Sequence, residues 1–260
     1  MNEDFVGSEL ARDELAYFEA QFRESNSEFW RRLGGVDLAG KTVLDIGCGH
    51  GALAVQAAQQ GAVRVVGIDI DKTRIDFARR NVALNFPELA SRVSFHEGTL
   101  DEIQGQFDIA LSKDSFEHID DLSAMLRSIA SRLDENGLLV TGFSPLYYSP
   151  FGDHGRYWAG SRKIPWLPAV LPERVLFRVA THRRGETVTS ASDVGLNKLT
   201  PSLFRAMVES QGWEVLTWAT NAGGKRGLAA LKALSRVPAL ERYCTVSIYA
   251  QLRKPANTTA

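Results

Sequence analysis

The stretch Val43-Leu44-Asp45-Ile46-Gly47-Cys48-Gly49-His50-Gly51 decides the fold of this 260-residue chain. An apolar run ends, glycines follow at alternate positions, and the Ala-rich segment 52–60 continues with helical spacing. The pattern predicts a buried strand over 42–46, a tight turn and then a helix. Glycines in such a turn permit positive φ and let a ligand approach the backbone without obstruction by Cβ atoms.

The alternation of strand and helix continues beyond this turn. Further apolar runs predict strands over 64–69, 93–95, 107–111, 138–142, 213–218 and 245–252. Asp71 is placed to cap one intervening helix, and Gly137 to stop the helix that begins near residue 122. Strands that alternate with helices of this length predict an α/β fold, with a seven-stranded, mostly parallel sheet covered by helices on both faces.

The chain is expected to form a single domain over 1–260, with a helical segment over 8–34. From about 145 to 199 the apolar residues no longer recur at strand or helix spacing. We interpret this stretch as a cap-like insertion beside the sheet. The insertion holds eight Lys/Arg against four Asp/Glu. This composition favours an aromatic pocket with a basic rim or, equally, a solvated basic face. The aromatic residues concerned are Phe151, Trp158, Trp166 and Phe177.

Composition narrows the class of protein. A formal net charge of −1, with no concentrated Lys/Arg run, argues against a nucleic-acid partner. Two cysteines exclude a disulfide scaffold and indicate a reducing, cytoplasmic location. The acidic start lacks the apolar core of a secretory signal, and no run is suited to integral membrane association. The basic, amphipathic segment 225–242 leaves weak contact with a membrane surface open, and the oligomeric state is not predicted.

A carboxylate is expected on each side of the glycine turn. Asp45 precedes the turn, and Asp69 ends the next predicted strand, 18 residues past Gly51. A carboxylate in the second position can accept hydrogen bonds from both hydroxyls of a ribose. The loose match Gly47-x-Gly49-x-x-Ala52 leaves NAD open as the ligand. Asp45 argues against NAD, because dinucleotide enzymes usually have an apolar residue at that position before their glycines. The Gly-x-Gly-x-Gly spacing is a second argument against NAD.

Two motifs resemble those of the class I S-adenosylmethionine-dependent methyltransferases of the small-molecule, type 11-like group. The stretch 45–51 is similar to the first motif of that family, and Gly67-Ile68-Asp69-Ile70 to the second. The resemblance covers roughly residues 18–139 and the C-terminal strand pair. It implies a Rossmann-like fold with a C-terminal antiparallel pair, methyltransferase activity, and S-adenosylmethionine as cofactor. Asp45 would then orient the methionine ammonium, and the backbone of Gly47 and Gly49 would line the methionine and ribose.

Later segments extend the implied cofactor site. Thr99 stands where the family commonly has an acid for the adenine amino group, so that contact comes from Thr99, a backbone group or Asp101, or is absent. The segment 112–119 resembles the one that passes under the methionine, with its backbone near Lys113 and Asp114 touching the cofactor. The Asn/Asp-Pro-Pro-Tyr motif of base-amine and glutamine methylation is absent. The implied set is Asp45, Gly47, Gly49, Gly51, Asp69, Ile70, Gly98, Thr99, Leu100, Lys113 and Asp114.

An alcohol acceptor also requires a base. We favour His154, in the glycine- and aromatic-rich run after the fifth strand, and hold His118 as the second candidate. The alternative for His154 is packing against Trp158. A divalent cation held by Asp114, Asp153 and His154 is open, but no coordination motif indicates a metal.

Together these features predict methylation of a small molecule, a natural-product, lipid or quinone-like acceptor, with oxygen favoured as the acceptor atom over nitrogen or carbon. Because the irregular cap would recognise the acceptor, the sequence does not identify it. An NAD-dependent oxidoreductase and a methyltransferase-like fold without methyl-transfer activity are the alternatives, since a fold does not determine its chemistry.

Overall fold

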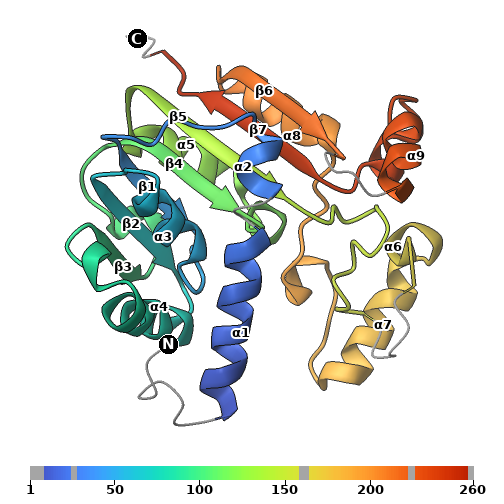
Figure 1. The fold of residues 1–260 in the computed structure, drawn as a ribbon. Coiled ribbons are helices and arrows are strands. Elements are labelled where there is room, and N and C mark those ends of the chain that lie inside the picture. The colour runs from blue at the N-terminus through green and yellow to red at the C-terminus, as the bar shows by residue number, and fades with distance from the viewer. Residues whose placement is uncertain (1–8, 25–27, 158–163, 222–225, 257–260) are drawn as a thin grey trace.

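A computed structural model describes residues 9–24, 28–157, 164–221 and 226–256 (Figure 1). Its centre is a seven-stranded sheet in the order β3-β2-β1-β4-β5-β7-β6. The strands are β1 (Thr42–Ile46), β2 (Arg64–Asp69), β3 (Val93–Glu97), β4 (Phe107–Lys113), β5 (Leu133–Phe143), β6 (Glu214–Thr220) and β7 (Ile248–Arg253). Strands β1 to β5 pair in parallel, and β7 runs antiparallel to β5 and β6. The predicted α/β fold with a C-terminal antiparallel pair is confirmed.

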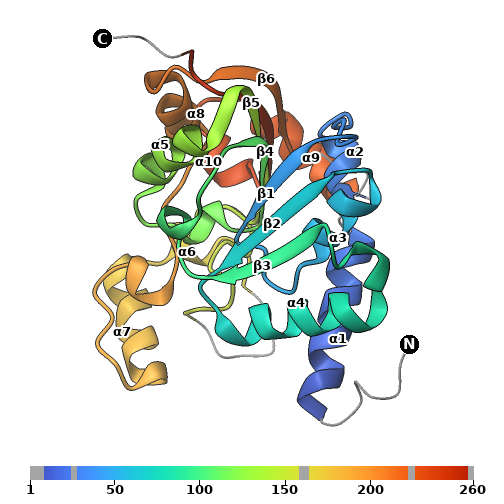
Figure 2. The same ribbon diagram turned by 90° about the vertical axis from the view of Figure 1, so that its left-hand side faces the viewer.

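Helices cover both faces of the sheet, as Figure 2 shows. One face carries α1 (Glu9–Glu24), α2 (Trp30–Arg32), α3 (Ala52–Gln59) and α4 (Lys72–Asn85), and the other α5 (Leu122–Arg132) and α8 (Pro201–Ser210). Strand β1 has Val43 in the first hydrophobic cluster and Leu44 in the second, and both side chains are fully buried. Burial on both faces explains why the central strands are continuous apolar runs.

Some helix ends follow local sequence. Asp71 caps α4 by accepting from the backbone N–H groups of Thr73 and Arg74. The expectation that Gly137 stops α5 was wrong. Helix α5 ends at Arg132, and the next residue, Leu133, begins β5 by pairing with Phe107 of β4. Leu133 continues the helical spacing of α5, but its pairing with a distant strand decides its conformation.

The remaining described helices lie in the connections between these elements. They are η3 (Pro87–Leu89), η4 (Leu100–Glu102), η5 (Phe116–His118), α6 (Leu167–Val170), α7 (Glu173–Arg184), η6 (Ser192–Val194), α9 (Arg226–Leu234) and α10 (Glu241–Cys244). In the ranges that the structure describes, no helix has the length and apolar character needed to cross a membrane.

The stretch from 145 to 199, called the cap below, has a hydrophobic cluster of its own. It comprises Tyr147, Tyr157, Leu167, Leu176, Ala180, Val188, Ala191, Val194 and Leu196. Figure 1 shows α6 and α7 set apart from the sheet, beyond the carboxyl ends of its central strands. The segment without periodicity is therefore packed around its own small core beside that edge of the sheet.

Candidate functional site

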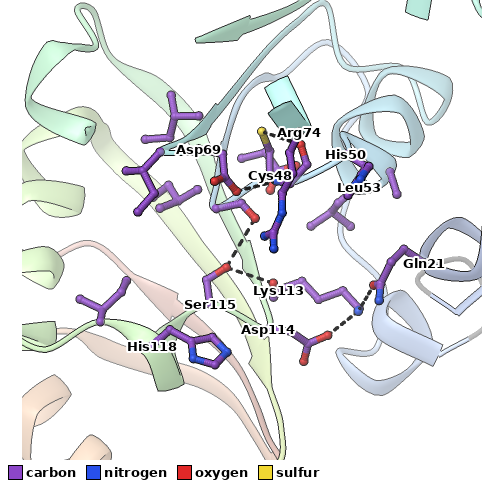
Figure 3. Close-up of a pocket in the computed structure, with 18 of the residues that line it drawn as sticks. Gln21, Cys48, His50, Leu53, Asp69, Arg74, Lys113, Asp114, Ser115 and His118 are labelled. Atoms are coloured by element: carbon purple, nitrogen blue, oxygen red, sulfur yellow. Dashed lines mark hydrogen bonds and ion pairs between the residues drawn. The ribbon is translucent and has the colours of Figure 1, made fainter. Parts of the chain in front are cut away.

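A cavity of about 670 Å³ lies at the carboxyl ends of β1, β2 and β4 (Figure 3). Helix α1 supplies Tyr17 and Gln21 to its wall, and the cap supplies Arg156 and Gly195. Every residue of the implied cofactor set lines the cavity except Gly51. Those that line it are Asp45, Gly47, Gly49, Asp69, Ile70, Gly98, Thr99, Leu100, Lys113 and Asp114.

The glycine turn brings bare backbone to the cavity wall. Gly47 and Gly49 have φ of 69° and 52°, as the sequence predicts for such a turn. A Cβ atom on Gly47 would lie 2.3 Å from the Ser115 Oγ, whereas one on Gly49 would meet no protein atom within 4 Å. The Gly49 N–H donates to Asp69 Oδ2 over 2.9 Å. Gly49 thus leaves open space for a ligand while its backbone is held in place.

Gly51 lies outside this wall, so its predicted contact with a cofactor is not supported by its position. It begins α3 as the N-cap with φ of 83°, and a Cβ atom there would lie 2.6 Å from the Phe95 ring. The requirement for glycine at this position comes from backbone conformation and from packing.

Gly51→Ala is expected to lower the free energy of unfolding by roughly 2–5 kcal/mol, because left-handed strain and overpacking add together. Gly49→Ala is the matched control and should lower it by only about 1–2 kcal/mol, since its Cβ atom meets open space. Denaturant unfolding measures both values, and an equal loss in the two variants would contradict the packing argument.

Asp45 presents a buried carboxylate to the cavity. The residue is 1% exposed, and its Oδ2 atom has no hydrogen-bond partner among the described residues. Burial and then the charge of Asp69 raise the pKa of Asp45 to about 7, against the opposing effects of the Ala54 N–H and Lys113. A buried acceptor without a partner is costly, so this site favours a ligand that carries a positive charge.

Asp45→Asn is expected to stabilise the ligand-free protein at neutral pH and to weaken binding of a cationic ligand. Between pH 3.8 and about 7 the folded state retains a proton on Asp45 that the unfolded state releases. The stability of the unsubstituted protein therefore falls as pH rises through this window, at roughly 1.4 kcal/mol per pKa unit of difference. The asparagine variant lacks this slope, and parallel curves of unfolding free energy against pH for the two proteins would refute the assignment.

Asp69 holds the glycine turn and still has capacity to bind a ligand. Its Oδ2 accepts from the Gly49 N–H and its Oδ1 from the Asp71 N–H, each over 2.9 Å. Each carboxylate oxygen has further lone pairs, so the side chain can accept hydrogen bonds from hydroxyl groups in the cavity.

Lys113 links the sheet to α1 across the cavity (Figure 3). Its Nζ donates to Gln21 Oε1 over 2.8 Å, pairs with Asp114 and lies 3.8 Å from Glu24. Burial would lower the pKa of Lys113, but Asp114 and Glu24 outweigh it and raise that pKa. Tyr17 and Gln21 were not predicted as site residues, although their spacing of four residues places them on one face of α1.

The cavity wall that follows β2 and β3 differs in part from the predicted adenine-binding segment. The Thr99 hydroxyl and N–H both donate to Glu102 Oε1, which closes η4 as a capping box. Asp101, considered as a substitute for the missing acid, does not line the cavity. Ile70 is 79% exposed at the cavity, an apolar surface that suits a flat, apolar group.

His118 has one ring nitrogen available to the cavity that it lines. Its Nδ1 lies 2.7 Å from the Gly195 carbonyl oxygen. A carbonyl only accepts, so Nδ1 carries the hydrogen, and the neutral ring keeps a lone pair on Nε2. Asn197 holds the same turn, since its Nδ2 donates to the carbonyls of Phe116 and Ile119 over 2.6 and 2.8 Å.

His154, the favoured base from sequence, does not line the cavity. With φ of 49° its backbone turns the ring back, so that Nε2 donates to the Pro145 carbonyl over 2.9 Å. The ring packs edge-on against His118, with centroids 5.1 Å apart. Burial lowers the pKa of His154. The geometry therefore favours His118 as the base, and Trp158, the expected packing partner of His154, lies outside the described residues.

The aromatic pocket expected in the cap does not form part of this cavity. Phe151 is 42% exposed, the Trp166 Nε1 donates to the Tyr243 carbonyl over 2.7 Å, and Phe177 packs against Tyr157. Within the described ranges no three His, Cys, Asp or Glu side chains gather as a metal site, so Asp114, Asp153 and His154 are not brought together as ligands.

Comparison with known proteins gives a match for less than half of the chain. Residues 37–144 match a family model described as a methyltransferase domain. The ubiquinone biosynthesis O-methyltransferase of Neisseria meningitidis serogroup C (strain 053442) is 33% identical over 118 residues, which cover 45% of this chain and 49% of the relative. The chain thus spans about half the length of that curated relative.

Solved structures share the fold over most of the chain. The magnesium protoporphyrin IX methyltransferase of Synechocystis PCC 6803 with bound SAH is 18% identical, with a TM-score of 0.54 over 98% of this chain and 89% of that one. A [4+2]-cyclase is also 18% identical, with a TM-score of 0.58 over 92% and 82% of the two chains. Such identities establish a shared fold and not a shared chemistry. Residues 37–144 therefore match a methyltransferase domain, and the strand order is that of the Rossmann-like class I methyltransferase fold.

Proposed function

We propose that the chain binds S-adenosylmethionine in this cavity and transfers its methyl group to an oxygen of a small molecule. The observation that carries the proposal is the buried Oδ2 of Asp45, without a described partner, near the open space at Gly49. The methionine ammonium would supply the missing partner. The pyrophosphate of NAD would instead place negative charge near Asp45 and Asp69, which is unfavourable.

The cofactor-binding residues have distinct tasks. Asp45 pairs with the ammonium, Asp69 accepts from the ribose hydroxyls, and Gly47 and Gly49 keep Cβ atoms out of the binding space. Lys113, through Gln21, keeps α1 over the cavity. S-adenosylmethionine, when bound, supplies an electrophilic methyl group on a sulfonium. Ile70, Gly98, Thr99 and Leu100 line the part of the cavity left for the adenine.

His118 is the proposed base. Methyl transfer is an in-line displacement that needs mainly alignment, with the acceptor oxygen about 3 Å from the methyl carbon. The free lone pair on Nε2 takes the proton of the acceptor hydroxyl, while Gly195 holds the Nδ1–H. The name of the relative, a ubiquinone biosynthesis O-methyltransferase, supports a quinone-like acceptor among natural-product and lipid candidates.

Thermal unfolding with candidate ligands tests the cofactor. S-adenosylhomocysteine at about 100 times its Kd should stabilise the protein by about 2.7 kcal/mol, and NAD(H) should leave the melting temperature unchanged. Stabilisation by NAD(H) and not by S-adenosylhomocysteine would overturn the proposal. Incubation with radiolabelled S-adenosylmethionine and a cell extract then tests for methyl transfer. Absence of labelled product despite binding would indicate that the fold serves another reaction, such as cyclisation.

We further propose that residues 1–260 form one domain, in the cytoplasm and without a nucleic-acid partner. The formal charge of −1 and the two buried, free cysteines support this setting. The basic segment 225–242 supports at most weak contact with a membrane surface.

A further inference from the structure

The cavity is lined by charged side chains of both signs. Asp45 and Asp69 lie at the end formed by the glycine turn. Figure 3 shows His118, on the turn after β4, apart from Asp69, and the cap contributes Arg156 to the cavity wall. The carboxylates at the glycine turn suit the positive charges of the proposed cofactor, which leaves Arg156 for the acceptor.

Arg156 differs from the other cations that line the cavity. Lys113 pairs with Asp114, and Arg74 pairs with Asp71 over 3.2 Å. Arg156 has no ion pair with any carboxylate of the described residues, and its side chain is exposed to the cavity. A guanidinium held at a cavity without a carboxylate retains its full capacity to bind an anion.

The backbone that carries Arg156 is held in place. Its N–H donates to the Asp153 carbonyl over 2.7 Å. From α7, one guanidinium nitrogen of Arg183 donates to the carbonyls of Gly155 and Arg156 over 2.7 and 3.3 Å. His154, in the same turn, packs against His118. The cation and the proposed base are therefore presented together by contacting segments, which lowers the entropy cost of binding a molecule that touches both.

We propose that Arg156 binds an anionic group of the acceptor, so that the acceptor is an organic acid whose hydroxyl group is deprotonated by His118. The inference rests on the proposed function and names its substrate class. The planar guanidinium fork matches a carboxylate in a bidentate arrangement, which fixes the orientation of the acceptor as well as its charge. The same unpaired positive charge disfavours amine acceptors.

Calorimetric titration of the S-adenosylhomocysteine-loaded protein tests this inference. The probes are matched pairs, 3,4-dihydroxybenzoate and 4-hydroxycinnamate, each against its methyl ester. At least one acid should bind about tenfold or more tightly than its ester. Arg156→Ala should abolish that preference and Arg156→Lys should retain part of it. Arg184→Ala, which removes a cation of the same cap outside the cavity wall, should leave the preference unchanged.

The loading step distinguishes the possible failures. If S-adenosylhomocysteine does not bind, the proposed function itself is wrong. If it binds but acids and esters bind equally, or neither binds, the assignment of an acidic acceptor is wrong. An Arg156→Ala variant that weakens acid and ester by the same factor would likewise overturn it, because Arg156 would then contribute packing and not charge recognition.

Discussion

Replacing His118 with alanine is expected to lower the rate of methyl transfer about 10²- to 10⁴-fold, the usual contribution of a general base. Its affinity for S-adenosylhomocysteine should stay unchanged, because the ring lies on the acceptor side of the cavity. The expectation follows from the hydrogen bond to the Gly195 carbonyl, which leaves Nε2 as a proton acceptor. Single-turnover transfer of labelled methyl measures the rate, and calorimetry measures the affinity.

His154→Ala is the matched control for this experiment. Its ring contacts His118 but does not line the cavity, so turnover should change only severalfold. A larger loss of turnover in the His154 variant than in the His118 variant would reverse the assignment of the base.

Asp69→Ala should weaken binding of S-adenosylhomocysteine by about 1–3 kcal/mol, as expected for the loss of charge-assisted hydrogen bonds. The substitution also leaves the N–H groups of Gly49 and Asp71 without their acceptor, so the glycine turn loses support. Calorimetry at constant ionic strength measures the change in affinity.

Two further variants make this test specific. Asp69→Asn keeps one acceptor oxygen. Its affinity for S-adenosylhomocysteine should lie between that of Asp69→Ala and that of the unsubstituted protein. Asp121→Ala removes a carboxylate that caps α5 outside the cavity, and it should cost about 1 kcal/mol of stability without loss of affinity. Unchanged affinity in Asp69→Ala would show that the ribose site is misassigned.

The fold could be predicted from the sequence because the central strands are buried on both faces. Such strands appear as short apolar runs, and caps such as Asp71 mark the helices between them. The error at Leu133 has a non-local cause. Its spacing fits α5, but pairing with Phe107, which lies 26 positions earlier, places it in β5.

The cavity wall at the strand ends was predictable because it is built from residues that directly follow strands. The opposite wall was not, because tertiary packing brings in Tyr17 from α1 and Arg156 from the cap. Sequence also could not distinguish His118 from His154. The choice depends on a positive φ at residue 154 and on the Gly195 carbonyl, which lies 77 positions from His118.

The separate core of the cap implies that this segment can be grafted. Its cluster shares no residue with the two clusters that pack on the sheet, whereas Leu146 and Leu199, at the two ends of the cap, belong to the second of these. Exchange of 147–196 with the same segment of a relative would therefore leave the sheet interior intact. The restriction is at 195–197, where the backbone carbonyl of Gly195 and the side chain of Asn197 hold the turn that bears His118. A chimera that keeps residues 195–197 of this chain should have the acceptor preference of the relative that supplies the cap. Its proton-transfer geometry at His118 should be that of the present chain.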